Sequence, residues 1–379
     1  MEALRVAIAG TGNIARVHAR ALSEAAGPAA DLVAVMDVDD RRLNSFGREF
    51  GIRETYRSLD DLLSHGRPDL VHVCTPPSAH YALALGCLRA GVSVLVEKPP
   101  TISLREFDEL AAADGGDGRP WFATVFQHRF GSGQRRLKAL ARGGVLGRPL
   151  VAICHTTWFR DQAYFDVPWR GRWDTEGGGP TMGHGIHQMD MLLDVLGEWT
   201  EVSALARTQA RATATEDLSL AHVAFASGAV ASVVNSVLSP REESYLRFDF
   251  ERATVELTHL YGYSDGDWRI TPAPGCESEV LGAWENAESG APSGHAAQFR
   301  HVRDALANGR RPPVGPAEAR RTMALIAGIY ASAFSREPVT PGQLAPGTPF
   351  YGQMNGTPAN RTPANRAPAS GAPMNRGQA

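Results

Sequence analysis

The feature that most constrains the fold is a regular alternation of short apolar runs with longer amphipathic stretches over residues 1–123. We predict that the apolar runs are strands, because they are rich in Val, Leu, Ile and Ala without polar alternation. Such runs are typical of strands buried on both faces of a parallel sheet. They cover residues 5–9, 32–37, 70–75, 93–97 and 121–125. With helices between them, they indicate a doubly wound α/β domain.

A glycine-rich loop, GTGNIA at 10–15, directly follows the first of these strands. Gly10 would permit a tight turn, and Gly12 would let a pyrophosphate approach the backbone at the start of a helix. The second strand ends at Asp37, whose carboxylate suits both hydroxyls of an adenosine ribose and would repel a 2′-phosphate. The alternative is an ordinary turn and a surface aspartate. We predict an NAD site, with NADP disfavoured, built from Gly10, Thr11, Gly12, Asn13, Ile14 and Asp37.

The pattern changes after residue 123. We predict strands at 150–159, 201–208, 218–226, 229–238, 245–251 and 253–260, and helices at 134–142, 295–308 and 316–335. Several of these strands alternate apolar and polar residues, so one face of their sheet is less deeply buried or is covered by a partner. Residues 273–295 are expected to form a long loop. The predicted units are a first domain at 1–123, a second at 124–341 and a disordered Pro/Ala/Asn-rich tail at 342–379.

The composition narrows the class of protein. A chain of 379 residues suits two domains, and its formal charge of −3 gives no strong attraction to nucleic acid or anionic lipid. The four cysteines form no CxxC pair, which disfavours a zinc site and a disulfide framework. No apolar run approaches the roughly 20 residues of a membrane span, and no secretory signal is evident. We therefore expect a cytoplasmic protein that acts on small molecules, without nucleic-acid or membrane partners.

A lysine follows the fourth predicted strand in VLVEKPPTIS, at 94–103. Lys98 would lie at the carboxyl edge of the sheet, where open α/β sheets bind ligands. Beside an oxidised nicotinamide, the ring's positive charge and partial burial would lower the pKa of this lysine. Lys98 could then accept or donate a proton near neutral pH. The alternative is a surface lysine at the end of a strand.

Four motifs, in this order, resemble the glucose–fructose oxidoreductase / inositol dehydrogenase / rhizopine catabolism (Gfo/Idh/MocA) family over about residues 4–340. They are GTGNIARVHARAL, CTPPSAH at 74–80, EKPPTIS at 97–103 and GGGPTMGHGIHQMD at 177–190. The resemblance implies an N-terminal Rossmann domain and a C-terminal α+β domain with a large open, predominantly antiparallel sheet. That sheet would join copies into a homodimer or homotetramer. The residues implied by the resemblance are catalytic Lys98 and His187 and cofactor-contacting Thr75, Pro76, His80, Glu97 and Lys98.

The last motif departs from the family pattern, which has an aspartate four residues before His187, where this chain has Gly183. Three interpretations stay open. His187 faces substrate and helps to relay its proton; His184, His187 and Asp190 bind a metal; or the histidines only cap and pack. We favour the first and expect no metal. Asp190 could steady the helix or the imidazole, and the triple glycine indicates a close backbone approach near ligand.

Further polar and aromatic residues are candidates for substrate contacts, since aromatic faces beside Arg suit a hydroxylated ring. They are Gln127, Arg129, Trp169, Arg170 and His184, and an ordinary packed loop is the alternative. Together these features predict an NAD-dependent oxidoreductase. It would transfer hydride between nicotinamide and a ring secondary alcohol of a sugar, sugar derivative or cyclitol, with Lys98 and His187 as acid/base groups. The alternatives are an NAD-retaining glycoside hydrolase on the same scaffold and a non-catalytic NAD- and sugar-binding sensor.

Overall fold

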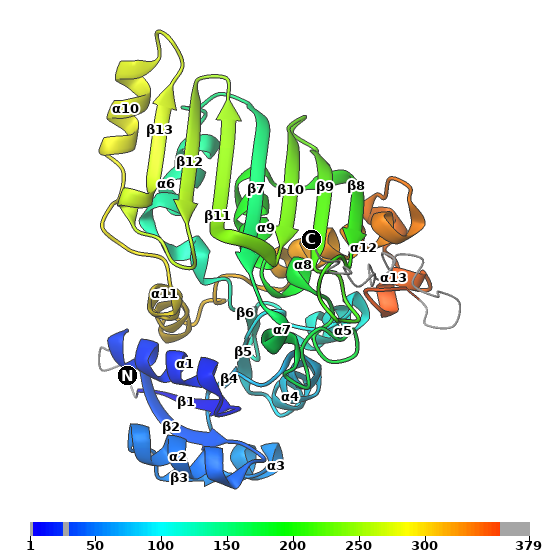
Figure 1. Cartoon of the computed structure of the whole chain (residues 1–379). Helices are drawn as coiled ribbons and strands as arrows, with labels where there is room; N and C mark the ends of the chain where they lie inside the picture. The colour runs from blue at the N-terminus through cyan, green and yellow to red at the C-terminus, as the bar shows by residue number, and fades with distance from the viewer. Residues whose placement is uncertain (1–2, 26–29, 357–379) are drawn as a thin grey trace, which may run out of the picture.

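The N-terminal part of the protein is built on a six-stranded parallel sheet (Figure 1). The structure is a computed structural model, and it describes residues 3–25 and 30–356. The strand order is β3-β2-β1-β4-β5-β6, and every neighbouring pair is parallel. In this order the connections reverse direction between β1 and β4, which is the position where Rossmann sheets bind dinucleotides. The strands are β1 Leu4–Ala9, β2 Ala30–Met36, β3 Glu54–Tyr56, β4 Leu70–Val73, β5 Ser93–Val96 and β6 Phe122–Thr124.

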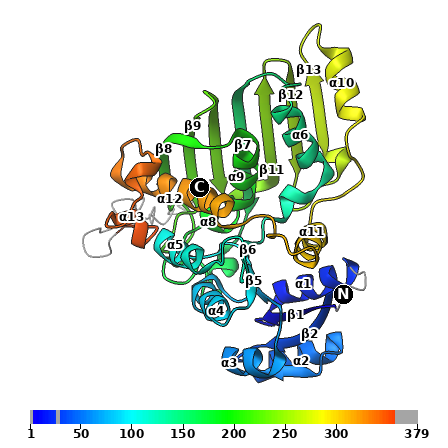
Figure 2. The same cartoon turned by 180° about the vertical axis from the view of Figure 1, so that it is seen from behind.

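Helices pack on both faces of this sheet, and one of them comes from late in the chain. Helix α11 (His295–Ala307) lies beside α1 (Asn13–Glu24) in both views (Figures 1 and 2). Its Phe299 and Val302 share a buried core cluster with Val6 of β1. The chain therefore returns to the first sheet after building the second. The other helical segments here are α2 Asp40–Phe50, α3 Leu59–Asp61, η1 Leu62–Gly66, α4 Pro77–Arg89 and α5 Leu104–Ala113.

The second part contains a seven-stranded sheet in the order β13-β12-β11-β7-β10-β9-β8. Among the described strands of this second sheet, only the β7–β10 pair is parallel. The expectation of a large, predominantly antiparallel sheet is therefore confirmed. The strands are β7 Pro149–Phe159, β8 Trp199–Arg207, β9 Leu218–Phe225, β10 Val230–Ser236, β11 Leu238–Phe250, β12 Ala253–His259 and β13 Trp268–Pro272.

The two faces of the second sheet differ. Helices α6 (Ser132–Arg142), α9 (Ile186–Leu196) and α12 (Pro316–Ser335) lie along one face (Figure 2). These helices are absent from the other face (Figure 1). Apolar side chains of neighbouring strands are 39–52% exposed there. The alternation in the sequence reflects this difference, because the period of two sends successive residues to opposite faces. The exposed apolar residues on this face are Val151, Phe159, Leu205, Leu220 and Val230.

Some predicted boundaries differ from the structure. The predicted loop at 273–295 contains helix α10 (Glu277–Glu285), which is anchored by buried Val280 and Trp284. The packed chain also continues past residue 342, because Leu344 and Met354 are buried. In both segments a few buried apolar residues lie among Gly, Pro and polar residues. Because of this composition, the sequence does not predict that these segments pack. Residues 357–379 of the predicted tail lie outside the described part of the chain. The remaining short elements are η2 Gln127–Phe130, α7 Gln162–Phe165, α8 Pro180–Gly183, η3 Asp265–Asp267, η4 Pro341–Gln343 and α13 Pro349–Gly352.

No helix among residues 3–25 and 30–356 is both long and apolar enough to cross a bilayer.

Candidate active site

The loop between β1 and α1 leaves the start of α1 accessible. Gly10 has a φ of +93°, and a Cβ there would lie 2.9 Å from the backbone of Cys74, so the turn requires glycine. Gly12 precedes the helix and has no side chain to cap it, and a Cβ there would meet nothing within 4 Å. The first N–H groups of α1 thus border open space. This arrangement binds phosphate through free N–H donors and the helix dipole.

Two further groups beside this loop fit a dinucleotide. The Asp37 Oδ2 atom accepts hydrogen bonds from the backbone N and the hydroxyl of Thr11, each at 2.7 Å, and Oδ1 accepts one from Asp39 N at 2.9 Å. These bonds orient the carboxylate and leave lone pairs for ribose hydroxyls. The buried hydroxyl of Thr75, after β4, has no hydrogen-bond partner among the described residues. An oriented carboxylate, an unpaired hydroxyl and an open helix start therefore suit NAD.

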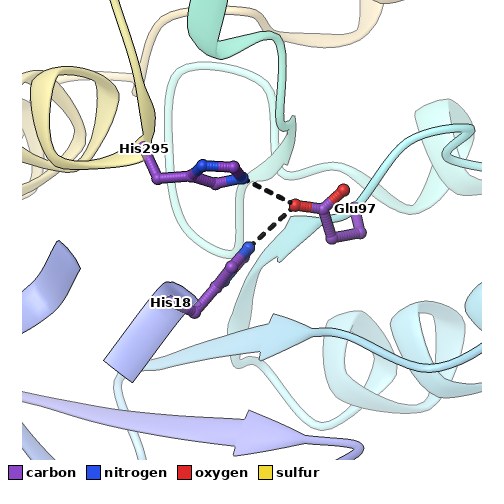
Figure 3. A group of neighbouring side chains, drawn as sticks. All are labelled: His18, Glu97 and His295. Atoms are coloured by element: carbon purple, nitrogen blue, oxygen red, sulfur yellow. Dashed lines mark hydrogen bonds and ion pairs between the residues drawn. The ribbon is translucent and has the colours of Figure 1, made fainter. Parts of the chain in front are cut away.

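Glu97 is held by two histidines from distant segments (Figure 3). Its Oε1 lies 2.8 Å from His18 Nε2 of α1 and 3.2 Å from His295 Nε2 of α11, while Oε2 accepts a hydrogen bond from Lys98 N at 3.0 Å. Burial alone would raise the pKa of Glu97, but the bonds from both histidines outweigh it and hold the pKa well below its ordinary value. The Glu97 carboxylate, at a residue that the sequence predicts to contact the cofactor, is thus engaged inside the protein and fixes the Lys98 backbone.

The three side chains of this triad could also be considered as metal ligands, because their ligand atoms lie within 4.8 Å of one another. The 2.8 Å separation of His18 Nε2 from Glu97 Oε1 is that of a hydrogen bond. Two ligands on a tetrahedral zinc ion stand ~3.3 Å apart, as follows from bond lengths of about 2.0–2.1 Å. Hydrogen bonding accounts for the triad as it stands.

His80 also serves to position other groups. One ring nitrogen lies 2.8 Å from the carbonyl oxygen of Thr75 and the other 2.8 Å from that of Pro99. The imidazole is 1% exposed and connects the loop after β4 to the loop after β5. Both ring nitrogens of His80, which the resemblance implies to contact the cofactor, are thus engaged by main-chain carbonyl oxygens. Pro76 is the residue that precedes α4, beside Thr75.

Lys98 reaches from the edge of the first sheet to the motif that contains His187. Its Nζ donates a hydrogen bond of 2.9 Å to the carbonyl oxygen of Gly183, at the end of α8. His187 lies in the first turn of α9, immediately beyond. Burial lowers the pKa of Lys98. Burial, followed by the charge of Lys98, lowers the pKa of His187 well below its ordinary value, so this imidazole is neutral at pH 7.

Around His187 lie buried polar side chains that lack hydrogen-bond partners. Both ring nitrogens of His187 are unpartnered among the described residues. Its ring stands edge-on to that of His128 at 4.8 Å and to that of Tyr261 at 6.0 Å between centroids. An unpaired buried polar group costs about 1–3 kcal/mol, so a cluster of them indicates a place where a ligand supplies the partners. The other unpaired atoms are Nδ1 of His128, His184 and His259 and Oε1 of Gln127 and Gln188.

This cluster includes residues that sequence reasoning missed. His259 ends β12, and Tyr261 follows it. The hydroxyl of Tyr261 accepts a hydrogen bond of 3.1 Å from Gln127 Nε2, and His259 Nε2 lies 2.7 Å from Gln188 Nε2. The available signal was weak, namely polar and aromatic residues at the end of an apolar strand.

Arg129 and Asp190 belong to a different network. Arg129 Nε and Nη2 each donate to Asp190 at 2.6 Å, and Nη1 lies 3.1 Å from both Asp194 and Glu318. Because residues 190 and 194 are four apart on α9, both face the same arginine. The prediction of Arg129 as a substrate contact is thus corrected to a structural ion pair. Asp190 is also unavailable to steady His187 or to join His184 and His187 around a metal.

The loop before the three glycines positions the remaining candidates. The Arg170 guanidinium lies 4.0 Å from the ring centroid of Tyr164 and 4.2 Å from that of Trp169. Its Nη1 donates to Glu176 Oε1 at 3.2 Å. His184 Nε2 is 3.4 Å from the hydroxyl of Tyr164. Glu176, which the sequence reasoning did not select, is 4% exposed.

The triple glycine packs against protein. A Cβ on Gly179 would lie 2.0 Å from the carbonyl oxygen of Glu216, and one on Gly178 would lie 2.2 Å from the hydroxyl of Tyr330. The Glu216 carboxylate accepts hydrogen bonds from Gly179 N at 3.0 Å and Thr181 N at 3.1 Å. The close approach expected from the sequence is therefore made to Glu216 in the loop before β9 and to α12, and the ligand interpretation of these glycines is corrected.

A glycine-rich loop at the reversal point of a Rossmann sheet, and a lysine at the edge of that sheet that reaches the second domain, suit a nicotinamide-dependent oxidoreductase. Residues 4–119 match the model of an oxidoreductase family with an NAD-binding Rossmann fold, GFO_IDH_MocA. Residues 134–256 match a C-terminal domain of the same family. The two matches cover more than half of the 379 residues. The chain belongs to the Gfo/Idh/MocA family, as the sequence motifs predict.

Known relatives are dehydrogenases. D-apiose dehydrogenase of Paraburkholderia graminis is 26% identical over 349 residues, which are 86% of this chain and 87% of that protein. D-glucoside 3-dehydrogenase of Escherichia coli K12 is 32% identical over 198 residues, 51% of this chain and 54% of that protein. The structure of the WlbA dehydrogenase from Bordetella pertussis, in complex with NADH and UDP-GlcNAcA, gives a TM-score of 0.78 at 25% identity, covering 89% of this chain and 98% of that one. The present protein is accordingly an NAD-binding enzyme of the dehydrogenase class.

Proposed function

We propose that this enzyme exchanges a hydride between NAD and a secondary alcohol on the ring of a sugar, sugar derivative or cyclitol. The observation that carries the proposal is the contact of Lys98 Nζ with Gly183 O, which brings the lysine of the first domain to the His187 motif of the second. The unpaired polar atoms around His187 provide donors and acceptors for several hydroxyl groups.

Lys98 and His187 divide the acid/base work. In the oxidative direction the neutral amine of Lys98 accepts the hydroxyl proton, and its lowered pKa makes that form more accessible than in an ordinary lysine. The neutral imidazole of His187 uses one unpaired nitrogen to orient the reacting oxygen. When bound, the nicotinamide accepts the hydride at C4. General acid/base assistance of this kind contributes roughly 10²–10⁴ in rate.

The cofactor is held by the β1–α1 loop and the end of β2. We assign the phosphates to the N–H groups from Gly12 to Ile14 and the adenosine ribose to Asp37. The carboxylate of Asp37 disfavours the 2′-phosphate of NADP through charge repulsion. Gly10, Thr11, Thr75 and Pro76 complete the cofactor side. For the substrate we retain Gln127, Trp169 and His184 and add His128, His259 and Tyr261.

The open face of the second sheet supports assembly into a homodimer or homotetramer. Five apolar side chains on β7 to β10, Val151 and Phe159 among them, are 39–52% exposed there, and exposed apolar patches of this kind mark association surfaces. All four cysteines are unpaired, which fits a reducing cytoplasm.

The test is a panel of sugars, cyclitols and nucleotide sugars, followed at the nicotinamide absorbance band with NAD and with NADP. Net NADH formation from a free alcohol is expected. An NAD-retaining glycoside hydrolase would cleave an aryl glycoside without net NADH, and a sensor would turn over nothing.

The Lys98→Ala variant tests the assigned base. Turnover is expected to fall by roughly 10²–10⁴ because the proton acceptor is lost, while the Kd for NADH, measured by fluorescence titration, changes little. Lys138 is the only other lysine in the chain and pairs with Asp194, so Lys138→Arg is the matched control. Unchanged turnover in Lys98→Ala would remove Lys98 from the mechanism.

A further inference from the structure

Gly183 has no evident need to be glycine. It lies at the end of α8 and does not adopt a positive φ. A Cβ built on it would meet a single neighbouring atom within 4 Å, Glu176 Oε1 at 3.5 Å, which is ordinary van der Waals contact. Backbone geometry therefore permits a side chain here. What occupies the adjacent space is a carboxylate from the preceding loop.

Glu176 is fixed in that place by two bonds from its own loop. Oε2 accepts a hydrogen bond from Gly171 N at 2.6 Å, and Oε1 accepts one from Arg170 Nη1 at 3.2 Å. Only 4% of the residue is exposed. The ammonium of Lys98 contacts the same Gly183 through its carbonyl oxygen at 2.9 Å. A buried carboxylate and a partly buried ammonium thus both lie against one glycine.

We propose that Glu176 is the carboxylate partner of Lys98, taking the place of a side-chain carboxylate at position 183. This inference rests on the proposed function. When Lys98 takes the proton from the substrate hydroxyl, an ammonium forms in a mostly buried site, and the negative charge of Glu176 stabilises it. The proton passes from the hydroxyl oxygen to Nζ, and Glu176 neither gains nor loses one. Glu176 is thus a positioning residue that acts through Lys98.

The charged and titratable groups around Lys98 are consistent with this role. Burial lowers the pKa of Lys98; the negative charges of Glu97 and Glu176 act against this, and Arg170 adds to it. Burial likewise raises the pKa of Glu176, opposed by Gly171 N, Arg170 and Lys98. The remaining groups that sense these charges are His80, His128, Tyr164, His184 and His187.

Of the two carboxylates near Lys98, Glu97 is hydrogen-bonded to a pair of histidines and Glu176 is not. Glu97 is engaged by His18 and His295, which belong to α1 and α11. Its Oε2 bonds to the backbone N of Lys98, so this carboxylate fixes the main chain. Glu176 approaches from the second domain, where Lys98 Nζ ends. Both carboxylates raise the pKa of Lys98, Glu97 more than Glu176, but only Glu176 lies on the side of the second domain, beside the residue that Nζ contacts.

The titration of Lys98 can be read directly, because the chain has only two lysines. In a Lys138→Arg background, reductive methylation with ¹³C-formaldehyde labels Lys98 as the sole lysine, and NMR follows its pKa. Glu176→Gln is expected to lower this pKa, since a stabilising negative charge is removed. Asp174→Asn, an exposed carboxylate of the same loop that pairs with Arg172, is the matched control and should leave it unchanged. An unmoved pKa in Glu176→Gln would overturn the proposal.

Turnover provides the second readout. Glu176→Gln should lower kcat by roughly tenfold or more, with little change in NADH affinity, and should shift the acid limb of the pH profile to lower pH. Adding Gly183→Asp to this variant returns a carboxylate to the same space and is expected to restore kcat in part and to raise the Lys98 pKa again. A merely structural glutamate would not be rescued in this way. Failure of the double variant to raise either quantity would count against the inference.

Two controls keep the outcomes separate. Gly183→Asp alone adds a second carboxylate near Lys98, so it decides the matter if Glu176→Gln does not fold: the Lys98 pKa should rise, and an unchanged pKa contradicts the proposal. Lys98→Ala separates the two levels of inference. If it leaves turnover unchanged, the proposed function fails. If it abolishes turnover while Glu176→Gln alters neither kcat nor the Lys98 pKa, only the role of Glu176 fails.

Discussion

The two halves of the proposed active site are stabilised differently. On the side of the first sheet, Glu97 has partners for both carboxylate oxygens, and His18 and His80 have partners for both ring nitrogens. On the side of the second sheet, neither nitrogen of His187 has a partner among the described residues, and Gln127 leaves its carbonyl oxygen unpaired. Around Glu97 and His80 the first half pairs its polar groups within the protein, apart from the Thr75 hydroxyl, whereas the second half leaves several polar groups for a ligand to satisfy.

This difference separates stability from activity. Hydrogen bonds inside the first half hold the cofactor loop, the Lys98 backbone and α11 in place, and they contribute to the folded state whether or not ligand is present. The unpaired atoms of the second half cost free energy in the empty protein and recover it when a polyhydroxylated ligand binds. Substitutions on the two sides should therefore have opposite signatures.

The largest expected effect on stability comes from Glu97→Ala. The change removes the acceptor for His18, His295 and Lys98 N and leaves buried donors unpaired, so the free energy of unfolding should fall by roughly 3–5 kcal/mol. Denaturant unfolding of the NAD-free protein measures it. Glu97→Gln keeps one acceptor oxygen and should lose less. A loss below about 1 kcal/mol in Glu97→Ala would show that the first half is not held by its own bonds.

His187→Leu should give the opposite signature. Turnover is expected to fall by roughly 10² because the group that orients the hydroxyl is lost. The empty protein should be as stable as the parent or more stable by about 1 kcal/mol, since two unpaired buried nitrogens are replaced by an apolar group. Steady-state kinetics and denaturant unfolding measure the two quantities. The control is His155→Leu, which makes the same replacement at a half-buried histidine of β7. If His187→Leu destabilised the protein as much as Glu97→Ala does, the proposed difference between the two halves would be contradicted.

Asp37→Ala tests the cofactor side on a smaller scale. Loss of the carboxylate removes both the ribose acceptor and the repulsion of a 2′-phosphate, so the ratio of kcat/KM for NAD over NADP should fall by roughly tenfold, the worth of one hydrogen bond to a charged group. Steady-state kinetics with both cofactors measure the ratio. Equal use of NAD and NADP by the parent enzyme would show that Asp37 does not select the cofactor.

The same division explains what the sequence could predict. The first sheet and its glycine loop follow from contiguous motifs, because the turn at Gly10 and the strand end at Asp37 are local features. The second half is assembled from residues 127, 187, 259 and 261. No local sequence pattern indicates that these residues lie together in the fold. Motifs also do not show which way a polar side chain faces. Glu97, His80 and Arg129 were predicted to contact ligand, yet each is engaged by other protein groups.

Glu176 illustrates a further reason why the prediction was incomplete. The family pattern has an aspartate four residues before His187. Because this chain has Gly183 there, the sequence suggests that the carboxylate has been lost. In three dimensions the segment between α7 and α8 folds back, so that Glu176 Oε1 lies 3.5 Å from where a Cβ of residue 183 would be. A carboxylate can be supplied from another point of the chain, and only the fold reveals it.

The smallest predicted effect is a displacement of the pH profile, and it reports on the boundary between the halves. The neutral amine of Lys98 is the form that accepts the hydroxyl proton, so kcat/KM for oxidation rises as pH rises through the Lys98 pKa. Burial lowers that pKa from the 10.5 of an ordinary lysine; the plateau should therefore be reached at lower pH. In the reductive direction the ammonium donates, and the rate should fall through the same pKa. Rate profiles in both directions measure it. Lys98 is fixed from the first half through its backbone and contacts the second half through Nζ. A limb of the pH profile that persists in Lys98→Ala therefore belongs to a group other than this lysine.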